Sequence, residues 1–137
     1  MNKFFLFVVL IVCSATVWGQ QKSLQIICTP PLKASPGQTI KLQVKVAHLL
    51  KEEKTGTLNL SLFNHATNKS VDGWFINIFP FQYFTTIDKE NFEVEFPFTV
   101  PHEFKGNFDI ELVAKVQNIS DSVRYTVNTS IKNNKTN

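Results

Sequence analysis

The chain contains 137 residues with a formal net charge of +3, and 18% of the residues are charged. This length suits one ordinary domain, and so low a charge content excludes an intrinsically disordered polymer. The 5 glycines, 6 prolines and 2 cysteines are too few for a fibrous chain, a low-complexity chain or a disulfide scaffold. We therefore expect a single globular domain.

Residues 1–19 have the pattern of a secretory signal peptide. Lys3 supplies the positive start, and an unbroken apolar run from Phe4 to Val12 follows it. The run is about half of the ~20 residues that a membrane-spanning helix needs, so we expect no stable membrane span. Cleavage before Gln20 predicts a secreted or periplasmic protein. Lipoprotein processing at Cys13, which follows a loose lipobox, is the less favoured alternative.

The mature chain is expected to carry little net charge. Signal-peptide cleavage removes Lys3 and no acidic residue, and the remaining lysines are scattered singly. Nucleic acids and anionic membranes are bound by concentrated basic faces, so neither is an expected partner. Cleavage also leaves Cys28 as the sole thiol, which excludes an internal disulfide. We favour a buried Cys28 on a strand, with intermolecular pairing as the alternative.

Apolar and polar residues alternate along most of the mature chain. Between Thr39 and Val46 the apolar residues hold every even position, which is the period expected of a strand with one buried face. Five segments with this pattern predict five strands. A sixth strand is expected from Leu24 to Thr29, and the stretch from Gly73 to Thr85 is expected to add one or two on either side of Pro80. The five segments are residues 39–46, 58–62, 92–98, 108–114 and 123–127.

Turn-forming residues separate these segments at short intervals. About seven half-buried strands in a chain of this size are stable when two antiparallel sheets face each other. The predicted fold class is therefore all-β, an antiparallel immunoglobulin-like β-sandwich of about seven strands over residues 20–131. Residues 132–137 are polar and are expected to form a disordered tail.

The titratable residues form no pattern that carries chemistry. The histidines have no partner at a metal-ligand spacing, and the paired carboxylates Glu93 and Glu95 alternate with apolar residues as on a solvated strand face. There is also no nucleophile elbow and no phosphate-binding glycine loop. We expect no catalytic residue, no metal and no cofactor, and hence no enzyme. The residues considered for these roles are His48, His65, His102, Glu93, Glu95, Asp72, Asp88 and Asp121.

The segment from Trp74 to Phe84 departs from simple alternation because apolar residues occupy both odd and even positions. In one interpretation, Pro80 breaks the strand and the chain wraps an edge of the sandwich, so that both sets of side chains pack internally. In the other, some of the side chains form an exposed patch that docks on another protein. The candidate protein-binding residues are Trp74, Phe75, Ile76, Phe79 and Phe81.

A series of short motifs resembles one sandwich domain of the large alpha-2-macroglobulin family proteins of Bacteroidetes-type bacteria. The resemblance spans most of the mature chain and implies a macroglobulin-type sandwich that follows a bait region. Full-length relatives resemble protease traps in which cleavage of the bait triggers a rearrangement. The motifs are Asp72-Gly73-Trp74-Phe75, Phe79-Pro80, Gln82-Tyr83-Phe84-Thr85, Phe96-Pro97, Val100-Pro101, Leu112-Val113-Ala114-Lys115 and Ser120-Asp121.

Departures from the family limit what the resemblance implies. The thioester signature Gly-Cys-Gly-Glu-Gln and a bait segment are absent from this sequence, so the chain cannot act as a self-sufficient trap. The favoured hypothesis is a non-catalytic protein-binding module whose partner is a protease or a larger macroglobulin protein. Inhibition of an endopeptidase by direct binding is one alternative, and an adhesion or structural module of the cell envelope is the other.

Overall fold

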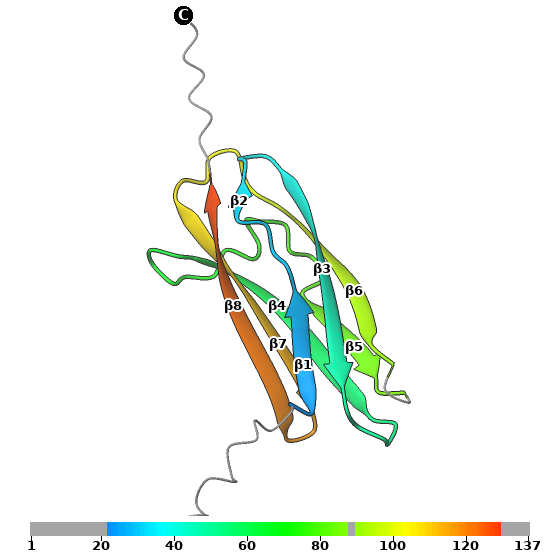
Figure 1. The fold of residues 1–137 in the computed structure, drawn as a ribbon. Helices are drawn as coiled ribbons and strands as arrows, with labels where there is room; N and C mark the ends of the chain where they lie inside the picture. The colour runs from blue at the N-terminus through cyan, green and yellow to red at the C-terminus, as the bar shows by residue number, and fades with distance from the viewer. Residues whose placement is uncertain (1–21, 88–89, 130–137) are drawn as a thin grey trace, which may run out of the picture.

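The computed structural model describes residues 22–87 and 90–129, and these form a sandwich of two β-sheets (Figure 1). The predicted signal peptide, Cys13, Asp88 and the predicted tail lie outside the described residues. One sheet has three strands in the order β1-β3-β6, and all its pairings are antiparallel. Its strands are β1 (Leu24–Cys28), β3 (Thr39–His48) and β6 (Phe92–Thr99).

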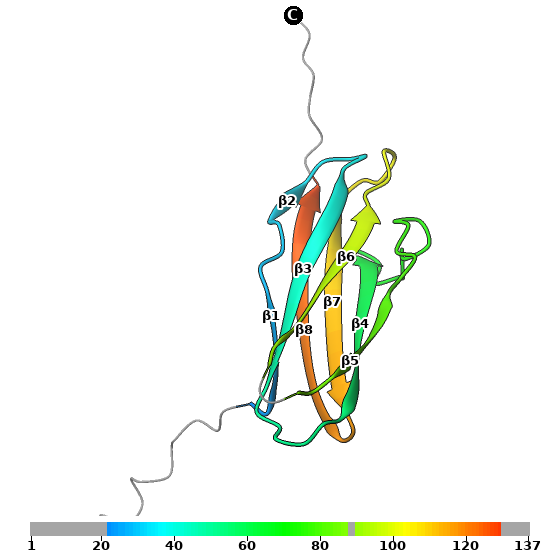
Figure 2. The same ribbon diagram turned by 90° about the vertical axis from the view of Figure 1, so that its right-hand side faces the viewer.

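The second sheet has five strands in the order β2-β8-β7-β4-β5. Its pairings are antiparallel except for the short parallel contact between β2 and β8. Figure 2 shows the two sheets from the side, as layers that face each other. The strands of this sheet are β2 (Lys33–Ala34), β4 (Thr55–Asn64), β5 (Phe81–Thr85), β7 (Asn107–Val116) and β8 (Ile119–Thr129).

The core lies between the sheets because each strand turns its apolar residues to the same side. Along β3 the even-numbered residues are buried and the odd-numbered ones are exposed or half-buried, as the alternation requires. β4 and β7 repeat this arrangement from the opposite sheet. Aromatic rings fill the centre of the core, where Phe98 and Phe108 meet across the layers with ring centroids 6.0 Å apart.

The predicted fold class is confirmed, with eight strands in the described residues. All five segments predicted from alternation lie in strands, and the predicted strand at Leu24 ends at Cys28, shortly before Pro30 and Pro31. The sequence pattern missed β2, which has two residues and so shows no period. Of the one or two strands expected between Gly73 and Thr85, the structure has one, β5 after Pro80, whereas residues 72–76 before the proline form turns.

Candidate protein-binding surface

The segment from Trp74 to Tyr83, which runs from the β4–β5 connection into β5, carries the largest group of exposed apolar side chains among the described residues. Trp74, Ile76, Phe79 and Phe81, all predicted to bind protein, are between 48% and 66% exposed. Two further residues of the same segment are also exposed but were not singled out from the sequence. We define the apolar surface as Trp74, Ile76, Ile78, Phe79, Phe81 and Tyr83.

Phe75 is the exception among the predicted binding residues. Its side chain is fully buried and meets the rings of Phe104 and Phe108 edge-on, at centroid distances of 4.9 and 5.0 Å. The turn of residues 72–76 points this ring inward while Trp74 and Ile76 on either side of it stay exposed. The prediction that Phe75 docks on a partner is therefore wrong, and its ring instead fixes the loop to the core.

Hydrogen bonds donated by the buried Asn77 and accepted by Asp72 hold the same loop against β4. The Asp72 carboxylate accepts from the backbone N–H of Leu62 at 2.8 Å and from Asn77 Nδ2 at 3.0 Å. Asn77 Nδ2 also donates to the carbonyl of Leu60 at 3.1 Å. A loop whose buried polar groups are paired in this way loses little further conformational entropy when a partner binds.

Ile76 adopts a left-handed backbone conformation, with φ at 55°. This region is unfavourable for β-branched residues because Cβ crowds the backbone. The conformation is maintained by neighbouring contacts, including the bond from the Asn77 N–H to the Asp72 carbonyl at 3.0 Å. Strain of this kind persists where the surrounding structure over-determines it, and it is frequent at ligand-binding sites.

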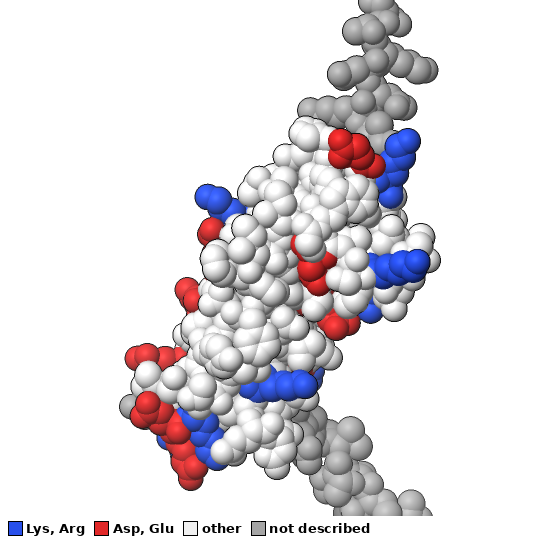
Figure 3. All heavy atoms as spheres, turned by 180° about the vertical axis from the view of Figure 1, so that it is seen from behind, with Lys and Arg blue, Asp and Glu red and all other residues white. Residues whose placement is uncertain are grey.

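Five of the six residues of the apolar surface form two groups, and Trp74 stands apart from both, against the rings of Phe75 and Phe104. The loop group, Ile76, Ile78 and Phe79, lines a hollow of about 160 Å³ together with Pro97 and Phe98 of β6. The strand group, Phe81 and Tyr83, lies on the outer face of the five-stranded sheet, with ring centroids 5.4 Å apart. In Figure 3, uncharged side chains cover most of one face of the molecule, and a few charged side chains lie among and around them. Apolar side chains that are exposed together suit contact with another protein.

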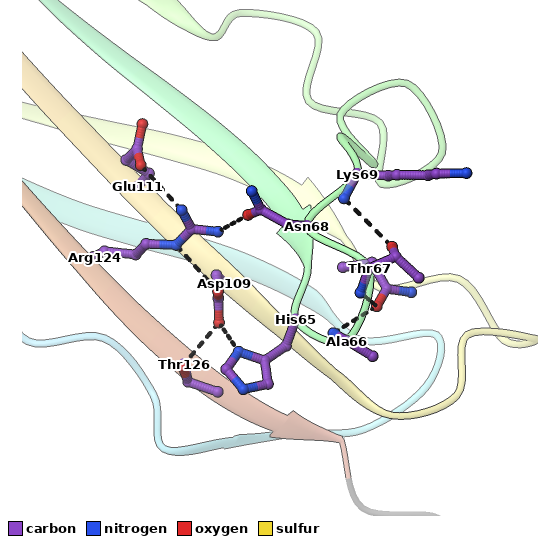
Figure 4. Close-up of polar contacts among 10 residues, drawn as sticks. His65, Ala66, Thr67, Asn68, Lys69, Asp109, Glu111, Arg124 and Thr126 are labelled. Atoms are coloured by element: carbon purple, nitrogen blue, oxygen red, sulfur yellow. Dashed lines mark hydrogen bonds and ion pairs between the residues drawn. The ribbon is translucent and has the colours of Figure 1, made fainter.

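Asp109 is the centre of a polar cluster on the outer face of β7 and β8, which sequence reasoning missed (Figure 4). Its carboxylate lies 2.8 Å from His65 Nδ1 and 3.1 Å from Arg124 Nε, and it accepts from Thr126 Oγ1 at 2.8 Å. Burial acts to raise the pKa of Asp109, but the hydrogen bonds from Thr126, His65 and Arg124 and the charge of His65 outweigh it and lower the pKa. Arg124 also stands 4.7 Å from the centre of the Phe63 ring.

The cluster has the parts of a structural network. In many hydrolases an aspartate orients a histidine that acts as the base. Such a pair is catalytic only when the second nitrogen of the histidine ring reaches a nucleophile. Within the described residues, no hydrogen bond joins His65 to a serine, threonine or cysteine side chain, and Thr126 donates to Asp109 instead. The arrangement therefore ties the loop that carries His65 to β7 and β8.

His48 is a second buried polar residue. It is the last residue of β3 and is only 5% exposed. Neither nitrogen of its ring has a hydrogen-bond partner in the described part of the chain. It lines a hollow of about 240 Å³ with Lys22 and Gln25.

Residues 22–87 and 90–129 contain no group of three His, Cys, Asp or Glu side chains that could hold a metal ion. They also contain no helix that is long and apolar enough to cross a membrane.

Cys28 is half-buried at the end of β1 and is not part of a disulfide. Burial raises the pKa of its thiol to about 11. The carbonyl oxygen of Cys28 accepts a hydrogen bond from the Tyr125 hydroxyl at 3.4 Å. A thiol with so high a pKa is a poor nucleophile near neutral pH, which fits the structural role favoured from the sequence.

Comparisons with known proteins support the fold but match no family. No family model and no curated protein matches this sequence. Among solved structures, the CARDB domain of the PF1109 protein from Pyrococcus furiosus, in complex with di-metal ions, superimposes with a TM-score of 0.59 at 11% identity, over 84% of this chain and 97% of that one. A chain of the complex between zinc 2-glycoprotein and prolactin inducible protein from human seminal plasma gives 0.57 at 11% identity, over 84% and 100%.

A third structure is part of a much larger protein. It is a cycloisomaltooligosaccharide glucanotransferase from a Paenibacillus species, with a TM-score of 0.60 and 16% identity. The match covers 80% of this chain but only 14% of the glucanotransferase. These three structures support an immunoglobulin-like sandwich, which is the fold that the macroglobulin resemblance implies. None of the three is a macroglobulin.

Proposed function

We propose that this protein is a secreted or periplasmic, non-catalytic module that binds another protein through its apolar surface. The observation that supports this most is the exposure of six large apolar side chains in one segment of ten residues, Trp74 to Tyr83. Exposed apolar residues elsewhere, such as Ile27 and Leu32, belong to other segments. A concentration of this kind on a soluble domain marks an interaction site.

The loop group is the proposed anchor. Aromatic and aliphatic side chains that are rigid before binding bury area without a large loss of rotamer freedom. Phe75 in the core and the hydrogen bonds of Asp72 and Asn77 supply that rigidity, and the hollow beside Phe79 offers space for a partner side chain. A similar sandwich occurs in the complex of zinc 2-glycoprotein with prolactin inducible protein, so this fold is compatible with stable protein binding.

We further propose that the partner is a protease or a larger macroglobulin protein. The resemblance to a macroglobulin-type domain supports a protease or a larger macroglobulin protein as the partner. The Asp72-Gly73-Trp74-Phe75 and Phe79-Pro80 motifs that contribute to this resemblance lie in the apolar surface and its anchors. A protease partner would make the module a direct endopeptidase inhibitor, which is the alternative function.

Site-specific photocrosslinking in the producing cell tests the proposal. A benzophenone amino acid at position 79 is expected to give one discrete protein adduct, which mass spectrometry identifies. The matched control places the same group at position 32, because Leu32 is 79% exposed but lies in a different segment. Ile76→Asp in the position-79 variant is expected to abolish the adduct. Equal labelling from positions 79 and 32, or an adduct that survives Ile76→Asp, would contradict the proposal.

The identity of the crosslinked protein then separates the alternatives. A large macroglobulin supports the accessory role, and a protease supports the inhibitor role. In the second case, the purified module is expected to slow that protease in a peptide-cleavage assay, and Ile76→Asp is expected to remove the inhibition. Adducts with polysaccharide-bound envelope components alone would favour the adhesion hypothesis.

A further inference from the structure

The two sheets have four edge strands, and two of these edges are closed by short length or by side chains. β2 has only two residues. Two of the outward-pointing backbone groups of β1 are bonded to side chains of β8: the N–H of Ile26 donates to Asp121 Oδ2 at 2.9 Å, and the carbonyl of Cys28 accepts from Tyr125. Edge strands protected in this way do not pair with other chains.

The edge of β6 is protected by proline and charge. Val100 N donates to Gln38 on the β3 side, so the odd-numbered residues of β6 point their backbone groups away from β3. Pro97 has no N–H, and the N–H of Thr99 already donates to the carbonyl of Phe75 at 2.7 Å. The remaining outward positions are Glu93 and Glu95, which carry charge.

The edge of β5 has none of these protections. Leu60 N donates to the carbonyl of Pro80 and Thr86 N donates to the carbonyl of Lys54, both at 2.8 Å, so the even-numbered residues of β5 pair with β4. The odd-numbered residues therefore turn their N–H and C=O groups to the open edge. In the described part of the chain, no hydrogen bond reaches these backbone groups. The open positions are Phe81, Tyr83 and Thr85.

We propose that two copies of this protein associate through their β5 strands, which pair antiparallel about a two-fold axis at Tyr83. Tyr83 then lies opposite its counterpart, and Phe81 lies opposite Thr85 of the second copy. Each of these pairs exchanges both of its N–H···O=C bonds, because the open backbone groups of β5 all belong to odd-numbered residues. The two five-stranded sheets become one continuous sheet across an isologous interface.

The side chains of β5 suit this self-pairing. The strand Phe81–Thr85 contains no charged residue, no glycine and no proline, so antiparallel pairing brings no like charges together. Pro80 precedes the strand with its carbonyl directed to β4, and its missing N–H does not interrupt the open edge. On the outer face, the rings of Phe81 and Tyr83 would form an aromatic cluster with those of the second copy. This association goes beyond the docking of a different protein, because it leaves the loop group outside the paired strands.

Sedimentation equilibrium of the chain as exported and processed by the producing cell tests the proposal. We expect a monomer–dimer equilibrium from low to high micromolar concentration. Tyr83→Lys and Tyr83→Glu each place like charges opposite one another at the axis, so each is expected to raise the dimer dissociation constant more than about ten-fold. An equimolar mixture of the two variants is expected to restore the dimer, because position 83 of one copy meets position 83 of the other. Leu32→Asp, at an exposed apolar position in a different segment, serves as the control and should leave the equilibrium unchanged.

Amide hydrogen exchange gives a second readout that does not require a variant. Protection of the Phe81 and Tyr83 amides is expected to rise with protein concentration, while that of the Gln82 amide, already paired with β4, stays constant. A monomer at all concentrations, or charge variants that are not rescued by mixing, would overturn the proposal. Neither result affects the crosslink from position 79, so the dimer and the binding function fail independently.

Discussion

Ile76 holds a backbone conformation that β-branched residues avoid, and its side chain is exposed. An isoleucine in this backbone conformation lowers the stability of the fold. Because its side chain is exposed, it buries little apolar surface to offset that loss. Asn77 and Asp72 keep the turn in place, so Ile76 is displayed by a loop that would favour a different residue at this position. The proposed role in binding would account for an isoleucine at this position.

Ile76→Asn is therefore expected to leave the free energy of unfolding unchanged or to raise it by up to about 1 kcal/mol, because asparagine tolerates the left-handed region. The same change should weaken the crosslink from position 79. Ile78→Asn is the matched control, since Ile78 is 66% exposed and has no positive φ. Urea unfolding of both variants checks the comparison. A loss of stability in Ile76→Asn greater than that in Ile78→Asn would argue against backbone strain.

Cys28 carries a thiol whose reactivity is suppressed by burial. Because burial raises its pKa to about 11, about one thiol in a thousand is ionised at pH 8. Alkylation of Cys28 in a Cys13→Ser background is expected to be at least about 100-fold slower in the folded protein than in urea. Mass spectrometry over a time course measures both rates. Comparable rates would reopen the possibility of intermolecular pairing through this thiol.

Among the elements, β1 is linked to the opposite sheet by side chains of β8, and Asp121 makes the shorter of the two hydrogen bonds to its backbone. Asp121 of β8 accepts from the Ile26 N–H at 2.9 Å and lies 3.2 Å from Lys22 Nζ, so it joins the outer edge of one sheet to the other. Lys22 is largely exposed, so its ion pair adds little. The buried bond to the backbone is the contact that matters for stability.

Asp121→Ala is expected to lower the free energy of unfolding by about 1–3 kcal/mol, because the Ile26 N–H is left buried without an acceptor. Asp121→Asn keeps an acceptor oxygen and should lose less. Ser122→Ala, on the exposed neighbour, is the control for changes in β8 itself. Urea unfolding gives the free energies, and faster exchange of the Ile26 amide would locate the effect. Equal stability of the alanine variant and the parent protein would show that β1 is held by packing alone.

For the whole molecule, the Asp109 cluster predicts how stability depends on pH. The pKa of Asp109 in the folded protein is lower than in the unfolded chain, so its contribution is complete above about pH 4 and is lost as the pH falls through the folded value. Arg124 and His65 then face an uncharged acid. Unfolding free energies measured from pH 7 down to pH 2 should fall less steeply in Asp109→Asn, with Glu103→Gln as the surface control. The same slope in all three proteins would remove Asp109 from the acid response.

The sequence predicts those parts of the fold that depend on local alternation. The even positions of β3 and the apolar rows of β4 and β7 follow directly from residue order. The segment before Pro80 could not be assigned, because the inward turn of Phe75 depends on its contacts with Phe104 and Phe108, which come much later in the chain. The pattern of Trp74 to Phe84 therefore indicated an unusual element without defining its shape.

The candidate site was predicted in composition and not in detail. Trp74, Ile76, Phe79 and Phe81 were named correctly as candidates for exposure, whereas Tyr83 could have been added because it shares the strand face of Phe81. The Asp109 cluster was missed because its members are distant in sequence: 44 residues separate His65 from Asp109, and 15 separate Asp109 from Arg124. Only the pairing of β7 with β8 and the hairpin loop after β4 bring them together.

The division of labour within residues 72–79 has a consequence for variation. Asp72, Phe75 and Asn77 secure the loop, while the exposed side chains of Ile76, Ile78 and Phe79 contribute little to the core. Mutations at positions 76, 78 and 79 can thus accumulate without unfolding the domain. Such a scaffold can acquire new binding specificities by substitution at its tip, and the same property makes it suitable for randomised display libraries.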